Sequence, residues 1–128
     1  MRFKIRYNVA ILLTQNGPHL MPHLLMFMRA GGCPDQATAK RCLDEFKIKP
    51  IEVNISRDAD AAEQLMNLAG CLAIPTFVVT DGNNQPIEPP RPMEPRRSVR
   101  NVDRGSIISE PTRDGLRAFL IRHGFLVT

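Results

Sequence analysis

Paired cysteines are missing from this chain, although it contains three cysteines, Cys33, Cys42 and Cys71. The count is odd and no two of them have the spacing of a redox pair, which argues against a secreted disulfide framework. At 128 residues the chain is long enough to bury one hydrophobic core without such bridges. We therefore expect a single domain over residues 1–128, kept reduced in the cytoplasm.

Long hydrophobic runs are also absent. No segment approaches the roughly 20 apolar residues of a membrane-spanning helix, so we expect no membrane partner. Residues 1–20 place basic residues before the apolar run 7–13, but Asn8 interrupts that run and no small-residue cleavage site follows it, which argues against export. We interpret residues 1–20 as an N-terminal extension, whose weak alternation over residues 3–13 suggests an extra edge strand.

Aromatic residues are scarce, at 5% of the chain, and tryptophan is absent. The arginine-rich residues 86–104 have no aromatic residues between them on which nucleic-acid bases could stack, so we do not expect nucleic acid as a partner. Phosphate-binding loops and hydrolase elbows are absent as well. His19 and His23 have no cysteine or acid at ligand spacing, and we expect no metal site.

Strand and helix patterns alternate in the middle of the chain. The apolar run 24–28 ends at two glycines, as expected of a buried central strand. Pro34 suits the first turn of a helix that should end near Lys47. Residues 51–55 alternate apolar and polar side chains and predict a second strand, parallel to the first and joined to it by a right-handed crossover.

A second helix is predicted after this strand, with Asp60 as its cap and Gly70 at its end. Its buried stripe should consist of Leu65, Leu68 and Leu72. These spacings place the helix between the second strand and a third one.

The third strand is predicted over residues 74–80, opened by Pro75. A short strand over residues 105–109 and a final helix follow, with Ser109 as the helix cap and Pro111 in its first turn. The apolar face of this helix should be formed by Leu116, Phe119 and Leu120.

Proline and arginine are concentrated in residues 86–104, before the last strand. The prolines recur every third residue, which places them on one edge of a polyproline II segment: Pro86, Pro89, Pro92 and Pro95. Five arginines lie in the same segment: Arg91, Arg96, Arg97, Arg100 and Arg104. We expect a stiff solvated loop, and a proline motif that docks on a protein partner is the alternative.

Cys33 follows two glycines and precedes Pro34, so it lies at a helix start, where the helix dipole favours a thiolate. Arg29 adds positive charge, whereas Asp35 opposes the thiolate by its like charge. Position 36, where a Cys-x-x-Cys motif has its second cysteine, is occupied by Gln36. A mixed disulfide formed at Cys33 would therefore need an external thiol to resolve it.

Cys42 does not replace the missing cysteine. Nine residues of helix place it about 13 Å along the helix axis from Cys33, beyond the reach of a disulfide. It shares the buried stripe of its helix, which predicts a core residue.

The order of these elements, with Gly32-Cys33-Pro34 before a helix and Ile74-Pro75 before a strand, resembles the glutaredoxin and thioredoxin superfamily. The likeness covers residues 23–80 and, more loosely, residues 105–125. It implies an α/β, thioredoxin-like fold with a four-stranded mixed sheet flanked by helices. The N-terminal extension and the Pro/Arg-rich insertion before the last strand are additions to that fold.

The resemblance also implies a site. Pro75 would follow a cis peptide bond and face Cys33, while the backbone of Ile74 would hold a bound thiol peptide or glutathione. Arg29 and Pro34 would complete the thiol-binding set. Cys71 would lie on the same side of the molecule as Cys33, either as a resolving cysteine or as a small buried side chain.

Two functions are compatible with these features. The first is thiol–disulfide exchange by a monothiol, glutaredoxin-like enzyme, with Cys33 as nucleophile, no tightly bound cofactor and an external thiol such as glutathione as co-substrate. Its substrates would be protein or small-molecule disulfides. The second is a non-catalytic thioredoxin-fold adaptor that binds a protein partner through the groove beside Pro75 or through residues 86–104. We take the first as the leading hypothesis.

Overall fold

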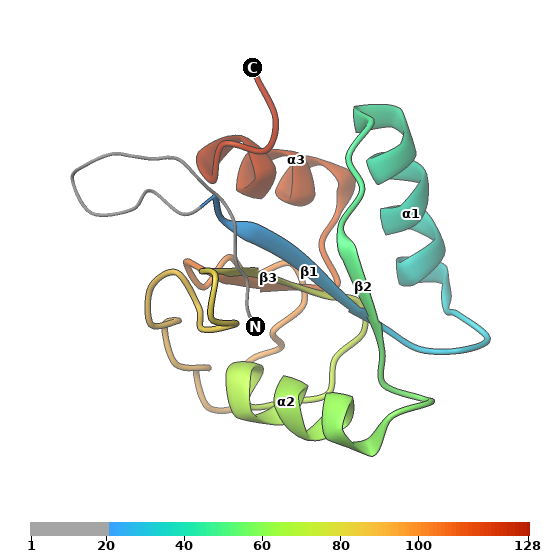
Figure 1. The fold of residues 1–128 in the computed structure, drawn as a ribbon, viewed down its shortest axis with the longest axis vertical. Coiled ribbons are helices and arrows are strands. Elements are labelled where there is room, and N and C mark those ends of the chain that lie inside the picture. Colours follow the sequence, from blue (N-terminus) through green and yellow to red (C-terminus); the bar gives the residue numbers. More distant parts are fainter. Residues whose placement is uncertain (1–20) are drawn as a thin grey trace.

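The computed structural model describes residues 21–128 as a mixed sheet with helices on both faces (Figure 1). The elements in chain order are β1 (His23–Met28), α1 (Pro34–Phe46), β2 (Ile51–Asn54), α2 (Ala59–Ala69), β3 (Thr76–Thr80), β4 (Ile107–Ser109) and α3 (Arg113–Arg122). The strand order is β2-β1-β3-β4. β2 is parallel to β1, whereas β3 is antiparallel to both β1 and β4. The expected thioredoxin-like fold is confirmed, and the suggested strand in residues 1–20 lies outside the described residues.

The sheet separates two layers of apolar packing. In Figure 1, α1 and α3 cover one face of the sheet and α2 covers the other. Alternate residues of β1 serve the two faces, because successive strand side chains point in opposite directions. Met26 packs with α1 and α3, while Leu25 and Phe27 pack with α2. None of the helices in residues 21–128 has the length and apolar character needed to cross a bilayer.

The start and end of α1 agree with the sequence prediction. Pro34 occupies the first turn, where its missing N–H leaves no hydrogen bond unmade. Ala39 and Leu43 face the core with exposures of 1% and 3%. The helix ends at Phe46, and Lys47 follows in the left-handed region with φ 61°.

The predicted cap and stripe of α2 are wrong by a few residues. Asp58, not Asp60, is the N-cap, and its carboxylate accepts a hydrogen bond from the Asp60 backbone N–H at 2.9 Å. Several capping-competent residues lie together here, so the sequence alone did not distinguish them. Leu72 is 47% exposed because the helix ends at Ala69, before the expected stripe is complete.

The predicted cap of α3 is also wrong. Thr112 is the N-cap, and its hydroxyl accepts a hydrogen bond from the Gly115 backbone N–H at 3.0 Å. Ser109 belongs to β4 instead, where its hydroxyl lies 2.7 Å from that of Thr76. The predicted apolar face of α3 is nevertheless confirmed, since its three members are at most 1% exposed: Leu116, Phe119 and Leu120.

The Pro/Arg-rich insertion is attached to the domain by Arg104. This arginine is 6% exposed, and it donates from Nη1 to the Ala69 carbonyl oxygen at 2.8 Å and from Nε to the Arg91 carbonyl oxygen at 2.7 Å. Burial lowers the pKa of Arg104. The two carbonyls and the negative C-terminal end of α2 offset the loss of hydration. The prediction of a purely solvated loop is therefore wrong at this residue.

Candidate functional site

Cys33 lies at the start of α1, next to the turn that leads into β3. It is the N-cap of α1, with extended backbone angles of φ −151° and ψ 166°, and it is half-buried. Its Sγ donates a long hydrogen bond to the Ile74 carbonyl oxygen at 3.8 Å. The Ile74–Pro75 peptide bond is cis. The structure thus brings together three residues that the resemblance placed in one site.

A shallow open groove runs beside Cys33. Its wall is formed by the turn before α1 and by the first two turns of that helix. Gly31 and Gly32 have φ values of 80° and 65°, a conformation that favours glycine. Their lack of side chains leaves room on this side of the thiol. The other lining residues are Pro34, Gln36, Ala37 and Lys40.

Gln36 has a structural role that its position in the motif does not reveal. Its side chain is 5% exposed, and it makes two hydrogen bonds with the backbone of Arg29. The amide oxygen accepts from the Arg29 N–H at 3.0 Å, and the amide nitrogen donates to the Arg29 carbonyl at 3.1 Å. A cysteine has no group able to make both bonds with comparable strength. Gln36 therefore holds the turn between β1 and α1.

We expect Gln36→Ala to lower the free energy of unfolding by about 2 kcal/mol, because both Arg29 backbone groups lose their partner. Chemical denaturation monitored by circular dichroism measures the change. Gln64→Ala, which removes the same amide from a partly exposed position in α2, is the matched control and should change stability by less than about 0.5 kcal/mol. Equal losses in the two variants would contradict the role given to Gln36.

Arg29 contributes to the site chiefly through its backbone, while its side chain is exposed. The cation that reaches the start of α1 is Arg100 from the insertion. Its Nη2 donates to Asp35 Oδ1 at 2.7 Å, and its Nη1 contacts the other carboxylate oxygen. This pairing lowers the pKa of Asp35 and raises that of Arg100. The sequence placed Arg100 in the insertion but did not predict its pairing with Asp35, because no local pattern joins residues 65 positions apart.

The other two cysteines lie on opposite faces of the sheet. Cys42 is 5% exposed in the cluster under α1 and α3, and burial raises the pKa of its thiol. The prediction of a core residue is confirmed. Cys71 is half-buried and packs against the same apolar cluster as Cys33, beneath α2. All three thiols are free, and a resolving role for Cys71 stays a prediction.

Residues 21–128 contain no group of three His, Cys, Asp or Glu side chains placed to hold a metal ion. His19 lies outside the described residues. The expectation that His19 binds no metal therefore stays a prediction.

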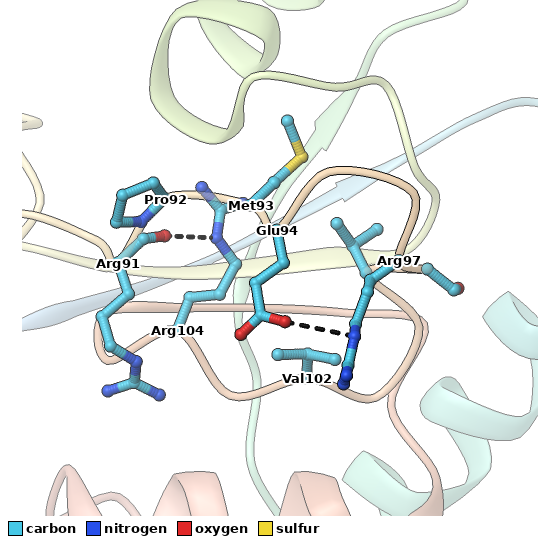
Figure 2. Close-up of a pocket in the computed structure, with 9 residues that line it drawn as sticks. Arg91, Pro92, Met93, Glu94, Arg97, Val102 and Arg104 are labelled. Atoms are coloured by element: carbon cyan, nitrogen blue, oxygen red, sulfur yellow. Dashed lines mark hydrogen bonds and ion pairs between the residues drawn. The ribbon is translucent and has the colours of Figure 1, made fainter.

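A second cavity, of about 340 Å³, lies within the insertion. Figure 2 shows how its charged side chains are engaged: Glu94 faces Arg97, at 3.2 Å, and the Nε of Arg104 points to the Arg91 carbonyl. The apolar part of the wall is formed by Pro92, Met93, Val99 and Val102. The cavity is separate in its lining from the groove beside Cys33.

Residues 24–83 match the model of the glutaredoxin family. The matched segment runs from β1 past the end of β3 and includes both Cys33 and Pro75. No curated protein and no solved structure matches the chain. The match supports the glutaredoxin and thioredoxin-like superfamily and, in general terms, a thiol redox function. The insertion at residues 86–104 lies beyond the matched segment.

Proposed function

Because residues 24–83 match the glutaredoxin family and lie in a thioredoxin-like fold, we propose that this protein catalyses thiol–disulfide exchange with Cys33 as a single nucleophile. The observation that carries the proposal is the position of Cys33 at the start of α1, with its Sγ 3.8 Å from the carbonyl of Ile74. The first N–H groups of α1 and the positive end of its dipole lie at this residue, and attack on a disulfide requires the thiolate form of cysteine.

The first step joins Cys33 to the substrate. The thiolate attacks one sulfur of a disulfide RSSR′, so that a Cys33–SR bond forms while the S–S bond of the substrate breaks. The leaving group R′S⁻ takes up a proton and departs as R′SH. Pro34, which lines the groove, and Pro75, which follows the Ile74 carbonyl beside the thiol, would hold the R group, and Arg29 would add positive charge for an anionic thiol.

The second step needs a thiol from outside the motif, because Gln36 occupies the place of a resolving cysteine. A thiolate R″S⁻ attacks the substrate sulfur of the Cys33–SR disulfide, forms R″SSR and returns the Cys33 thiolate. The net reaction is RSSR′ + R″SH → R″SSR + R′SH, so the protein is unchanged. Glutathione is the external thiol that we propose as co-substrate, with no tightly bound cofactor.

A coupled assay tests this proposal. The reduced protein is mixed with a mixed disulfide of glutathione and a small thiol, together with glutathione, glutathione reductase and NADPH, and NADPH consumption is followed. We expect a rate that rises linearly with protein concentration above the uncatalysed rate, together with a glutathione adduct on the Cys33 peptide in mass spectra. A rate equal to the blank without any adduct on Cys33 would reject the proposal.

The cavity in the insertion supports a second candidate, a non-catalytic adaptor that binds a protein partner there. The cavity has an apolar wall and lies outside the glutaredoxin match. Deleting residues 86–104 is a poor test because it removes the buried Arg104. Val102→Asp instead places a charge at a side chain that is 44% exposed. An adaptor would lose partner capture in Val102→Asp and keep it in Cys33→Ala. An exchange enzyme would instead keep its exchange activity in Val102→Asp and lose it in Cys33→Ala.

A further inference from the structure

The insertion contributes a charged residue to the thiol site. We propose that Arg100 is a positioning residue for Cys33: it holds the Asp35 carboxylate in an ion pair, so that the acid two residues after the thiol no longer opposes the thiolate. The inference rests on the proposed role of Cys33 as nucleophile, and it adds a residue from outside the segment that matches the glutaredoxin family.

The contact between Arg100 and Asp35 has the geometry of a specific ion pair. Both terminal nitrogens of the guanidinium meet the two carboxylate oxygens, one nitrogen to each oxygen. Such two-point pairing is the strongest arrangement for arginine and a carboxylate. Asp35 lies in the first turn of α1, two residues after Cys33, and its side chain is 25% exposed. Arg100 therefore reaches the first turn of α1, the helix whose N-cap is Cys33.

The backbone beside Arg100 is fixed by several hydrogen bonds. The Asn101 N–H donates to the Ser109 carbonyl at 2.8 Å, and Asn101 Oδ1 accepts from the Thr112 N–H at 2.9 Å. Gly115 leaves space for this side chain, since a Cβ built there would lie 2.1 Å from Asn101 Oδ1. These contacts fix the segment around Arg100 to the turn between β4 and α3.

The same turn is joined to the other side of the site. The Glu110 N–H donates to the Pro75 carbonyl at 2.7 Å. A series of contacts thus runs from Pro75 through the β4–α3 turn to the segment of Arg100, whose side chain pairs with Asp35, two residues after Cys33 in the chain. This anchoring is the reason to assign Arg100 to the site, because the backbone beside Arg100 and the carboxylate that it binds are both held by the elements that flank Cys33 and Pro75.

The pair keeps its charges over the pH range in which a thiol titrates. The hydrogen bonds from Arg100 hold the pKa of Asp35 below its ordinary value, so its carboxylate stays ionised at neutral pH, and the pair is lost only as the pH falls through that lowered pKa. Three further charged groups belong to the segments around the groove and the ion pair. Lys40 lines the groove and lies 3.9 Å from a carboxylate oxygen of Glu52, Glu110 acts on Arg100, and the Arg29 side chain is exposed.

Alkylation of Cys33 measures the effect directly. Iodoacetamide labelling is followed from pH 5 to 10, with the Cys33 peptide quantified by mass spectrometry. We expect Arg100→Gln to lower the labelling rate at pH 7 about threefold and to move the pH profile upward by about half a unit, because Asp35 is then unpaired. Asp35→Asn should raise the rate, and the double variant should return it close to that of the natural protein.

Two control variants separate charge from structure. Arg97→Gln removes another insertion arginine, one that pairs with Glu94, and should leave the labelling profile unchanged. Arg100→Lys keeps the positive charge and should restore most of the labelling rate. The proposal is overturned if Arg100→Gln labels like the natural protein, or if Arg100→Gln and Asp35→Asn change the rate in the same direction.

The labelling experiment is independent of turnover. A shifted profile in Arg100→Gln without any exchange activity in the natural protein would uphold the role of Arg100 and reject the proposed function. Exchange activity in the natural protein with an unshifted profile in Arg100→Gln would uphold the proposed function and reject the role of Arg100.

Discussion

Replacement of Cys33 by serine is expected to reduce thiol–disulfide exchange to the uncatalysed rate. A serine hydroxyl cannot form the mixed disulfide, and neither remaining cysteine lies at the start of α1. The NADPH-coupled assay measures the loss, and circular dichroism confirms that the variant is folded. A Cys33→Ser variant that kept more than about a tenth of the activity would show that another thiol is the nucleophile.

Cys71→Ser is the matched control for this prediction, because it removes a half-buried thiol that packs against the same apolar cluster. If an external thiol resolves the mixed disulfide, Cys71→Ser should retain the rate of the natural protein. If Cys71 resolves it, this variant should instead accumulate the Cys33 adduct and turn over more slowly. The two results distinguish the monothiol mechanism from the alternative left open for Cys71.

Phe77→Ala is expected to lower the free energy of unfolding by about 3–5 kcal/mol. Phe77 is fully buried in β3, within the cluster that joins the sheet to α1 and α3. Its removal leaves a cavity that the other members of the cluster, in β1, β4, α1 and α3, cannot readily fill. Urea denaturation at pH 7 provides the measurement, with the midpoint and slope compared with those of the natural protein.

Phe125→Ala serves as the matched control, because this phenylalanine is only partly buried at the edge of the same cluster. We expect it to lower the free energy of unfolding by about half as much or less. A loss at Phe77 no larger than that at Phe125 would mean that the cluster is not the main core of the domain.

The parts of the fold that the sequence predicted correctly depend on local signals. The apolar run of β1, the proline at the start of α1 and the glycine after α2 each specify a boundary through nearby residues. The predicted caps of α2 and α3 were wrong because each helix has two candidates able to cap it. They are Asp58 and Asp60 for α2, and Ser109 and Thr112 for α3. The choice between them depends on which residues the sheet holds extended.

The site was only partly predictable, because some of its contacts depend on residues that are far apart in the sequence. Cys33 and Pro75 stood out by their neighbours in the chain, whereas Arg100 reaches Asp35 across 65 positions. Gln36 was visible in the sequence only as the loss of a cysteine. Its two bonds to the Arg29 backbone depend on the turn geometry, which no pattern of residue types reveals.

The bonds made by Gln36 also limit how this protein can change. A single substitution to cysteine at that position would add a second thiol to the motif, but it would also remove both partners of the Arg29 backbone. The route from this motif to a two-cysteine one therefore passes through a less stable protein, unless another substitution first secures the turn. Selection for a stable fold would therefore favour glutamine over cysteine at position 36, whatever reaction the remaining thiol carries out.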